Sequence, residues 1–475
     1  MQRMSGLDAS FLYLETPTMP MHVGLVAVFD PSEAPSGYQF NRLYRLIEKK
    51  THAEPTLRRC LVEVPFGIDH PRWREEPGFD VLHHVRRVAC PAPGGMVELA
   101  ELSARIMGSL LDRSRPLWEI WVVEGLSHGR FALVAKVHHA ISDGLGGAQL
   151  LSTMLSADRG QVMSLRPPPV TEPESLPDEL TLLREAMRTR FSNPNGLLSM
   201  MRRTSTALQG FYERRREDAR RKGGSFLDAP SMPWNAPIEA ERITAFSQVP
   251  LDRVRFIRKA LKVTGNEIVL ALCSGALRRY LLETDQLPYE PLIAACPVAV
   301  RGKTQGDNRI SAMVTSLATH IVDPSTRLET IVQTVRNAKA EHDLLGGDLI
   351  ASWAELASPA MFHPIVRTYS KYRLARLHRP LYNLAISNVP GPRKPLYFDG
   401  SKLVEAYPLG PVIEGVGLNI TVMSYVDQLG FGFTAARNVF PELPRLAAYL
   451  PEATSELLSV AEQAAGKSTT EQKSA

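Results

Sequence analysis

The segment KVHHAISDGLGG, from Lys136 to Gly147, gathers the side chains best suited to catalysis. It follows an apolar stretch expected to be a strand and precedes one expected to be a helix, so two histidines, a carboxylate and a glycine share one tight turn. An imidazole titrates near neutral pH and accepts a proton from a hydroxyl or thiol that attacks a carbonyl. Because adjacent residues leaving a strand point in opposite directions, we expect one of His138 and His139 to face a cavity and the other to be structural.

The other residues of this turn have supporting roles in our interpretation. Asp143 is placed either to cap the next helix or to hold a nearby arginine, and Gly144 allows a backbone conformation that other residues resist. A metal site made of the two histidines and Asp143 is disfavoured, because no third histidine lies nearby in the sequence. A second histidine pair, His83-His84, has no Asp-Gly after it, and we interpret it as structural.

The turn must be positioned by strands and helices in no regular βαβ order, which predicts an α+β fold rather than a doubly wound sheet. Runs of apolar and β-branched residues predict strands at 22–30, 117–123, 131–137, 291–300, 309–319, 382–387, 415–425 and 429–436. Periodic stretches predict helices at 40–52, 144–155, 265–282, 327–345 and 442–464. We expect two domains, 1–160 and 241–465, a basic, proline-containing connection at 161–240 and a disordered tail at 466–475.

The composition is that of a globular protein, since 44% of the 475 residues are hydrophobic and 22% are charged, which excludes a wholly disordered chain. The four cysteines stand far apart without CxxC spacing, which argues against a zinc knuckle or a disulfide framework. No apolar run reaches about 18 residues, so we expect no membrane-spanning helix, and the N-terminus shows no secretory signal. We therefore expect a cytoplasmic protein that reaches any lipid from the membrane surface.

Nearly all of the net charge of +5 comes from one stretch. Between Thr181 and Lys222 there are 11 Lys or Arg and 4 Asp or Glu, which gives this stretch +7 (11 − 4). Apolar residues are interleaved with these cations, a pattern that suits either a solvated linker helix or contact with the anionic surface of a membrane or lipid droplet. In the second interpretation, Arg214, Arg215 and Arg216 contact the lipid. Nucleic-acid binding is disfavoured because no known nucleic-acid motif accompanies the charge.

The pattern HHxxxDG, here His138 to Gly144, is the signature of the coenzyme-A-dependent acyltransferase superfamily, which includes chloramphenicol acetyltransferase and peptide-synthetase condensation domains. Over nearly its whole length, the chain resembles the bacterial wax ester synthase/acyl-CoA:diacylglycerol acyltransferase family. The matching blocks, in order, are MSGLDASFLYLETPTMPMHVGLVAVFD at 4–30, Pro116-Leu117-Trp118, GNEIVLALCSGALRRYL at 265–281, CPVAVR at 296–301, SNVPGP at 387–392 and GLNITVMSY at 417–425.

The resemblance implies two chloramphenicol-acetyltransferase-like domains, each a mixed sheet flanked by helices, with an active-site channel between them. It implies that His139 is the general base, which deprotonates an acceptor hydroxyl as this attacks the thioester of acyl-CoA. The acceptor would be diacylglycerol or a long-chain alcohol, and the reaction would need neither a metal nor a cofactor. His138, Asp143 and Gly144 would shape the turn, with Arg301 as a candidate partner of Asp143.

Other blocks supply candidate substrate-binding residues, each with a structural alternative. These candidates are Pro116, Leu117, Trp118, Asn266, Asn388, Asn419 and Ser424. The Pro-Leu-Trp block lines a lipid pocket or fills the core at the start of a strand. Asn266 would brace the motif turn, but Glu267 stands where the family usually has Asp. Ser387-Asn388 and the stretch from Asn419 to Ser424 would place donors near the developing oxyanion or form plain structural turns.

Two other functions remain open. A condensation-type domain would form an amide on carrier-protein substrates, but the family blocks and the absence of an attached carrier domain argue against it. A non-catalytic lipid-binding scaffold of the same fold would bind lipid without turnover. The intact HHxxxDG argues against the scaffold, whereas Glu267 keeps it open.

Overall fold

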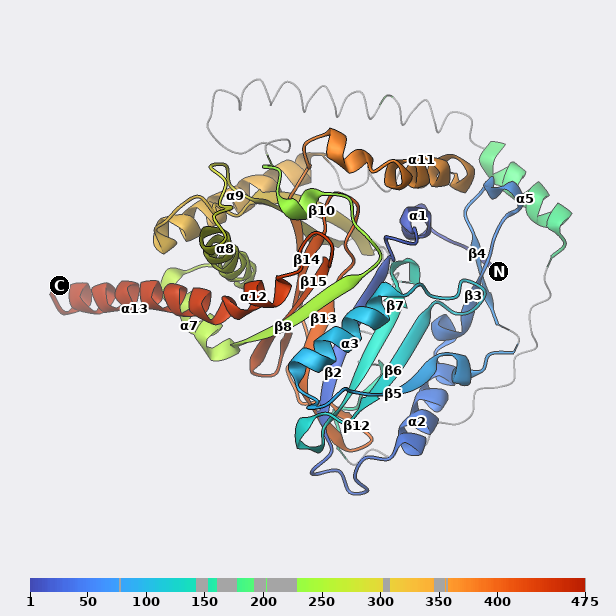
Figure 1. The fold of residues 1–475 in the computed structure, drawn as a ribbon, viewed down its shortest axis with the longest axis horizontal. Coiled ribbons are helices and arrows are strands. Elements are labelled where there is room, and N and C mark those ends of the chain that lie inside the picture. Colours follow the sequence, from blue (N-terminus) through green and yellow to red (C-terminus); the bar gives the residue numbers. More distant parts are fainter. Residues whose placement is uncertain are drawn as a thin grey trace.

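The computed structural model describes residues 1–76, 78–141, 153–159, 177–191, 202, 229–301, 308–345, 355 and 358–474. Within these ranges the chain forms two six-stranded sheets and one three-stranded sheet, with helices packed against them. Figure 1 shows the two large sheets side by side, each covered by its own helices. The two-domain α+β architecture expected from the sequence is therefore confirmed.

The first large sheet has the strand order β12-β13-β2-β7-β6-β5. Its strands are β2 (His22–Asp30), β5 (Val85–Ala89), β6 (Trp118–Glu124), β7 (Phe131–His138), β12 (Tyr397–Phe398) and β13 (Ser401–Leu409). Its helices are α1 (Gly6–Leu14), α2 (Phe40–Ala53) and α3 (Met96–Gly108). Strand β7 is buried at every position, because its apolar run lies between β2 and β6 and is covered on both faces of the sheet.

The second large sheet has the strand order β10-β9-β11-β14-β15-β8. Its strands are β8 (Arg242–Pro250), β9 (Ile293–Arg301), β10 (Asn308–Ser316), β11 (Leu384–Val389), β14 (Leu418–Tyr425) and β15 (Gln428–Ala436). Its helices are α7 (Leu251–Leu261), α8 (Gly265–Glu283), α9 (Pro324–Leu345), α12 (Leu443–Ala448) and α13 (Leu450–Ser474). Helix α8 lies in the centre of this half, and its side chains join the largest apolar cluster of the protein.

Several smaller elements complete the fold. The three-stranded sheet consists of β1 (Gln2–Arg3), β4 (Arg72–Glu75) and β3 (Arg59–Val62). Two further helices are α5 (Glu179–Phe191) and α11 (Pro359–Lys371). The short 3-10 helices are η1 (Pro55–Arg58), η2 (Pro65–Gly67), η3 (Val81–His83), η4 (Ser127–Gly129), η5 (His139–Ile141), η6 (Pro233–Asn235) and η7 (Leu374–Leu377).

The two halves of the chain are interlocked. Strand β13 comes from the C-terminal half but pairs antiparallel with β2 in the first sheet, where Leu403 and Tyr407 join the N-terminal cores. The expected C-terminal domain, 241–465, therefore gives residues 397–409 to the other sheet. Burial of these apolar side chains against β2 accounts for the exchange.

Most predicted elements are present, with two differences near the C-terminus. The single helix predicted at 442–464 is divided at Tyr449 into α12 and α13, where Pro451 follows at the start of the second helix. The tail at 466–475, predicted to be disordered, continues α13 through Ser474, since it contains no proline and several helix-favouring residues. The helix predicted at 144–155 and most of the connection at 161–240 lie outside the described residues.

No single helix in the described ranges has the length and apolar character to cross a membrane. One bent pair, α7 with α8 at 107°, meets these criteria by length and composition.

Candidate active site

The catalytic turn predicted from the sequence begins where β7 ends. The backbone N–H of His138 donates to the carbonyl of Leu117 at 2.9 Å, and that of His139 donates to the carbonyl of Met21 at 2.8 Å. Leu117 lies just before β6 and Met21 just before β2, so the ends of both neighbouring strands hold the turn. The position of the two histidines is therefore set by the sheet itself, which gives the rigidity that a catalytic group requires.

His139 is partly exposed, and its ring stacks on Phe11 of α1 with centroids 3.8 Å apart and an interplanar angle of 19°. Phe11 and Met21 both belong to an apolar cluster that also contains Ile238 and Val412 from the C-terminal half. The ring of His139 thus lies beside the seam between the two halves.

The imidazole of His139 is held in its neutral form. Its pKa is lowered to about 4, chiefly by burial and to a smaller extent by the charge of a protonated His138, while a hydrogen bond to its own backbone opposes the shift. Among the described residues, its Nδ1 atom has no hydrogen-bond partner of normal geometry. A neutral ring at pH 7 can accept a proton without first losing one.

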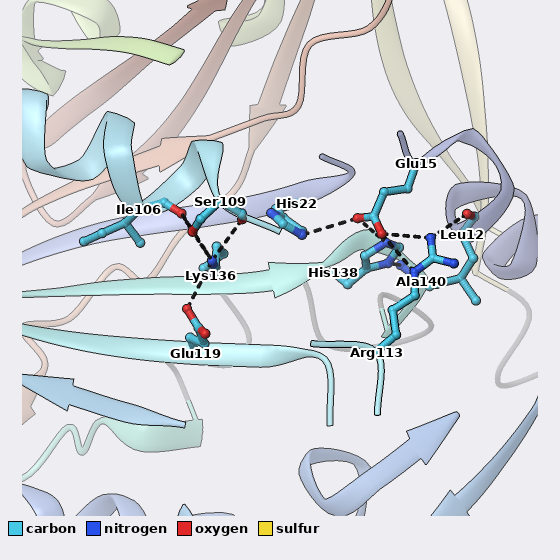
Figure 2. A network of polar contacts seen from close by, with 10 residues as sticks. All are labelled: Leu12, Glu15, His22, Ile106, Ser109, Arg113, Glu119, Lys136, His138 and Ala140. Atoms are coloured by element: carbon cyan, nitrogen blue, oxygen red, sulfur yellow. Dashed lines mark hydrogen bonds and ion pairs between the residues drawn. The ribbon is translucent and has the colours of Figure 1, made fainter. Parts of the chain in front are cut away.

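His138 points the opposite way and is fully buried, as the alternation of a strand predicts. The backbone N–H of Ala140 donates to its Nδ1 atom at 3.0 Å, so the ring proton must be on Nε2. Nε2 lies 3.2 Å from Oε2 of Glu15 (Figure 2). His138 therefore has a structural role, since both of its ring nitrogens face protein groups.

Glu15 is the centre of a buried polar cluster. Its Oε1 atom accepts from Nε and Nη2 of Arg113 at 3.0 and 2.8 Å, and its Oε2 atom lies 3.4 Å from Nε2 of His22 (Figure 2). Burial alone would raise the pKa of this carboxyl, but hydrogen bonds from His138 and His22 and the charge of Arg113 hold it well below its usual range. Burial lowers the pKa of His22 to about 4. The cluster thus contains a carboxylate, a guanidinium and two neutral histidines.

A second buried charge, Lys136, lies two residues before His138 on the same strand. Its Nζ atom donates to the carbonyls of Ile106 and Ser109 at 3.2 and 3.1 Å and lies 3.1 Å from Oε2 of Glu119 (Figure 2). Lys136 thereby ties the end of α3 to β7. Sequence reasoning missed Lys136 and Glu15 as functional positions, although a lysine inside a fully apolar strand was a usable signal.

The Pro-Leu-Trp block packs in the core of the first half, and its alternative role in a lipid pocket remains a prediction. Pro116, Leu117 and Trp118 are all buried. The indole N–H of Trp118 donates to the carbonyl of Leu57 at 2.7 Å, and its ring stacks on His84 with centroids 4.5 Å apart. The block's link to the site is the Leu117 carbonyl that holds His138. The structural interpretation of His84 agrees with this packing.

The remaining candidates are spread over the second half. Asn419 donates from Nδ2 to the carbonyl of Pro411 at 3.0 Å, and Ser424 accepts at Oγ from the N–H of Gly391 at 3.2 Å. Asn388 is exposed on β11, and Asn266 is partly exposed in the first turn of α8. None of the contacts seen among the described residues brings these four side chains to His139. Their predicted roles at an oxyanion or the motif turn remain predictions.

Other predicted positions lie outside the described residues. These are Asp143, Gly144, Arg214, Arg215 and Arg216, together with the side chain of Arg301. Glu267, by contrast, has a clear local role. Its carboxylate accepts from the N–H of Thr264 at 2.6 Å, and Thr264 Oγ1 accepts from the N–H of Glu267 at 3.3 Å, so the pair forms the capping box that begins α8.

Comparison with known proteins identifies the family. Residues 4–269 match the wax ester synthase/diacylglycerol acyltransferase catalytic domain, and residues 306–458 match the C-terminal domain of the same family. The chain is 35% identical to O-acyltransferase WSD of Acinetobacter baylyi, over 95% of this chain and 96% of that one. It is 39% identical to a Mycobacterium tuberculosis protein provisionally named as a diacylglycerol O-acyltransferase, over 96% of this chain and 90% of that one.

Solved structures agree with this result. The wax ester synthase/diacylglycerol acyltransferase of Marinobacter aquaeolei is 29% identical and superposes with a TM-score of 0.70, over 97% of this chain and all (100%) of that one. A starter condensation domain of rhizomide synthetase, at 13% identity and a TM-score of 0.53 over 97% and 94% of the two chains, shares the fold. The chain belongs to the wax ester synthase/diacylglycerol acyltransferase family and is an acyltransferase.

Proposed function

We propose that the protein transfers a long-chain acyl group from acyl-CoA to diacylglycerol, giving triacylglycerol and free CoA, and that long-chain alcohols are alternative acceptors that give wax esters. The names of its relatives support this substrate class. The observation that carries the proposal is the state of His139. Its neutral ring is partly exposed and stacks on Phe11 beside the apolar cluster at the seam between the two halves.

His139 acts as the general base in this proposal. An unprotonated ring nitrogen takes the proton of the acceptor hydroxyl while the oxygen attacks the thioester carbonyl. The tetrahedral intermediate collapses as the C–S bond breaks, and the thiolate of CoA takes the proton back from the imidazolium. Every atom is supplied by the two substrates, so the reaction uses no acyl-enzyme, metal or cofactor.

The test is an assay of the purified protein with labelled palmitoyl-CoA and either diacylglycerol or hexadecanol. Labelled ester should form, and His139→Ala should reduce its rate by about two to four orders of magnitude. His83→Ala removes the exposed histidine of the second His-His pair and is the matched control, with an unchanged rate expected. Ester formation that survives His139→Ala would disprove the general-base role.

The same assay separates the alternatives. Amide formation on a carrier-bound substrate without ester formation would show a condensation-type enzyme. Tight lipid binding without turnover would show a scaffold. Acceptor preference follows from the ratio of kcat/KM for the two acceptors, because this ratio measures the difference in transition-state binding.

Peripheral attachment to the cytoplasmic face of the membrane or to lipid droplets is part of this proposal. The charge of the stretch from Thr181 to Lys222 supports it. Replacing Arg214, Arg215 and Arg216 with Gln should weaken binding to anionic liposomes at low salt and leave the unfolding transition in place. Unchanged binding would show that this stretch does not recruit the protein.

A further inference from the structure

Helix α11 presents apolar side chains on two of its faces, one turned to the protein and one exposed. On the inner face, Phe362 and Val366 pack against the core of the first sheet and the cluster at the seam. On the outer face, Met361, Ile365 and Tyr372 are 57%, 61% and 64% exposed. Spacings of four and seven residues place these three side chains on one side of the helix. Packing among the described residues explains the inner face only, and the outer face is available for another contact.

The loop beside the start of α11 extends the outer face. A Cβ atom at Gly67 would lie only 3.1 Å from the backbone N of Ala360, so η2 packs directly against the first turn of α11. The preceding residue, Phe66, is 81% exposed and has a φ of 59°, a left-handed conformation that is costly for a bulky side chain. The protein therefore holds this phenyl ring in solvent at the cost of backbone strain, which is typical of a functional position.

The charged residues of the segment that contains α11 are all positive. Residues 358–381 contain Lys or Arg at 367, 371, 373, 376 and 379 and no Asp or Glu. Arg367 and Lys371 are exposed on α11 and flank the apolar side chains. Leu377 and Leu381, just beyond the helix, are 78% and 48% exposed. Arg373 lies 3.8 Å from Glu239, so part of its charge is compensated. Apolar side chains bordered by cations match the layered chemistry of an anionic lipid surface.

The inner face of α11 connects this surface to the catalytic histidine. His363 packs edge-on against Tyr13 of α1 with ring centroids 5.3 Å apart, and Phe11 of the same helix stacks on His139. At the other end, Ser370 Oγ donates to Glu414 at 2.9 Å. Figure 1 shows α11 lying beside α1 along one edge of the molecule. Among the described residues, α1 lies between α11 and the candidate general base.

We propose that the outer face of α11 docks the enzyme on an anionic lipid bilayer. This docking face consists of Phe66, Met361, Ile365, Arg367, Lys371 and Tyr372. The apolar members enter the acyl boundary while the two cations meet phosphate groups. The bound orientation places the seam at His139 next to the lipid, so that a bilayer-borne acceptor enters from there. Docking is independent of the reaction, whereas delivery of the acceptor rests on the proposed function.

Flotation of the full-length protein with phosphatidylcholine liposomes, with and without phosphatidylglycerol, tests the docking. Met361→Glu with Ile365→Glu should weaken binding at least about tenfold, because two carboxylates cannot enter the acyl boundary. The matched control is Val97→Glu with Val322→Glu, which adds the same charge at exposed apolar positions elsewhere and should change binding by less than about twofold. Equal losses in both variants, or no loss in the first, would overturn the proposal.

The two cations have a matched control of their own. Arg367→Gln with Lys371→Gln should reduce the preference for phosphatidylglycerol, to which the stretch from Thr181 to Lys222 also contributes in the proposed function. The control is Arg255→Gln with Lys259→Gln, which changes the net charge by the same amount at a cavity of about 490 Å³ on α7. Figure 1 places α7 next to α13. This variant should keep the preference for phosphatidylglycerol. If the α7 variant loses the preference and the α11 variant keeps it, the docking face has been assigned to the wrong helix.

Activity assays separate docking from catalysis. The Met361→Glu/Ile365→Glu variant should turn over a soluble short-chain alcohol at the wild-type rate and lose turnover of diacylglycerol held in liposomes. Loss of both activities would show that this face supports the active site and does not dock. A change in oligomeric state on sedimentation, without a change in flotation, would show that the face contacts a second copy of the protein and does not dock. If the wild type floats but transfers no acyl group, the proposed function fails and the docking stands.

Discussion

The Nε2 atom of His138 lies 3.2 Å from Oε2 of Glu15, whose other oxygen accepts two hydrogen bonds from Arg113. This contact fixes the ring of His138. Because His139 follows directly in the backbone, the position of His139 is fixed with it. Arg113 also donates to the carbonyl of Leu12 in the last turn of α1 at 2.8 Å. Glu15 and Arg113 together therefore connect the end of α1 to the end of β7. The motif turn is therefore supported by a partly buried ion pair between two residues that lie 98 positions apart in the sequence.

Replacing Glu15 with Gln keeps the volume of the side chain and removes its charge. Arg113 then loses its counter-ion, and the amide cannot accept from three partners, so we expect the free energy of unfolding to fall by about 2–4 kcal/mol. Because the turn loses its support, kcat should fall about tenfold or more with little change in KM. Urea unfolding and steady-state kinetics measure the two effects.

Glu119→Gln is the control for Glu15→Gln, since Glu119 is a carboxylate that also contacts a buried β7 side chain, Lys136, but does not contact His138. It should lower the stability by removing the partner of Lys136 and leave kcat within about twofold of the wild type. Equal losses of kcat in both variants would mean that general destabilisation, and not the support of His138, explains the effect.

The low pKa of His139 makes a prediction for the pH dependence of the rate. A general base works in its unprotonated form, so activity is lost as the pH falls through its pKa. With a pKa of about 4, the ring is almost fully neutral at pH 5.5, whereas a histidine with an ordinary pKa of about 6.5 would be roughly nine-tenths protonated. Measured with substrates well below their KM values, kcat/KM reports the pKa of the free enzyme and should therefore stay within about twofold between about pH 7.5 and 5.5. A tenfold loss over this range would show that His139 titrates normally or is not the base.

The stacking of Phe11 on His139 should orient the imidazole. Phe11→Leu keeps an apolar side chain but removes the stacked ring, and we expect kcat to fall about two- to tenfold, as an aromatic pair contributes about 0.5–1.5 kcal/mol beyond area burial. Phe79→Leu removes a comparable stack on His84, with centroids 5.3 Å apart, and is the matched control. The comparison contradicts an orienting role if kcat falls equally in both variants.

The placement of Trp118 in the core predicts an effect on stability and not on substrate choice. Trp118→Phe loses the hydrogen bond to the carbonyl of Leu57 and leaves space in the core, which should cost about 1–3 kcal/mol. The relative rates with acyl-CoA chains of different length should not change. Trp121→Phe, at a partly exposed position of the same strand, should cost less. A shifted chain-length profile for Trp118→Phe would return this residue to the lipid pocket.

The local pattern of apolar residues was enough to predict the strands around the motif turn. A short apolar run such as that of β7 is typical of a strand in the centre of a sheet. The contrast between His138 and His139 followed from strand alternation alone. Pairing between distant segments leaves no such local signal. The exchange of β13 into the first sheet depends on its match to β2, which lies more than 350 residues away in the chain.

The support of the site was equally hidden in the sequence. Glu15 lies in a short, polar connection that reads as a surface turn, and its burial arises only when His22, Arg113 and His138 converge from three other segments. Trp118 shows the opposite problem. A tryptophan close to a proline suits a pocket and a core equally well, and the sequence does not show the contacts with Leu57 and His84 that hold its ring in this structure.

Glu267 gives a final prediction, because it occupies a position where Asp is usual in the resemblance described above. Its longer side chain reaches back to the N–H of Thr264 and completes a capping box at the start of α8. Glu267→Asp should shorten this reach and lower the free energy of unfolding by about 0.5–1.5 kcal/mol, and Glu267→Gln, which still reaches, should cost less. If Glu267 acts only as a cap, neither loss of stability will affect catalysis, and both variants will keep kcat at 25 °C within about twofold of the wild type. A rise in kcat for Glu267→Asp would instead show that a carboxylate at this position takes part in the site.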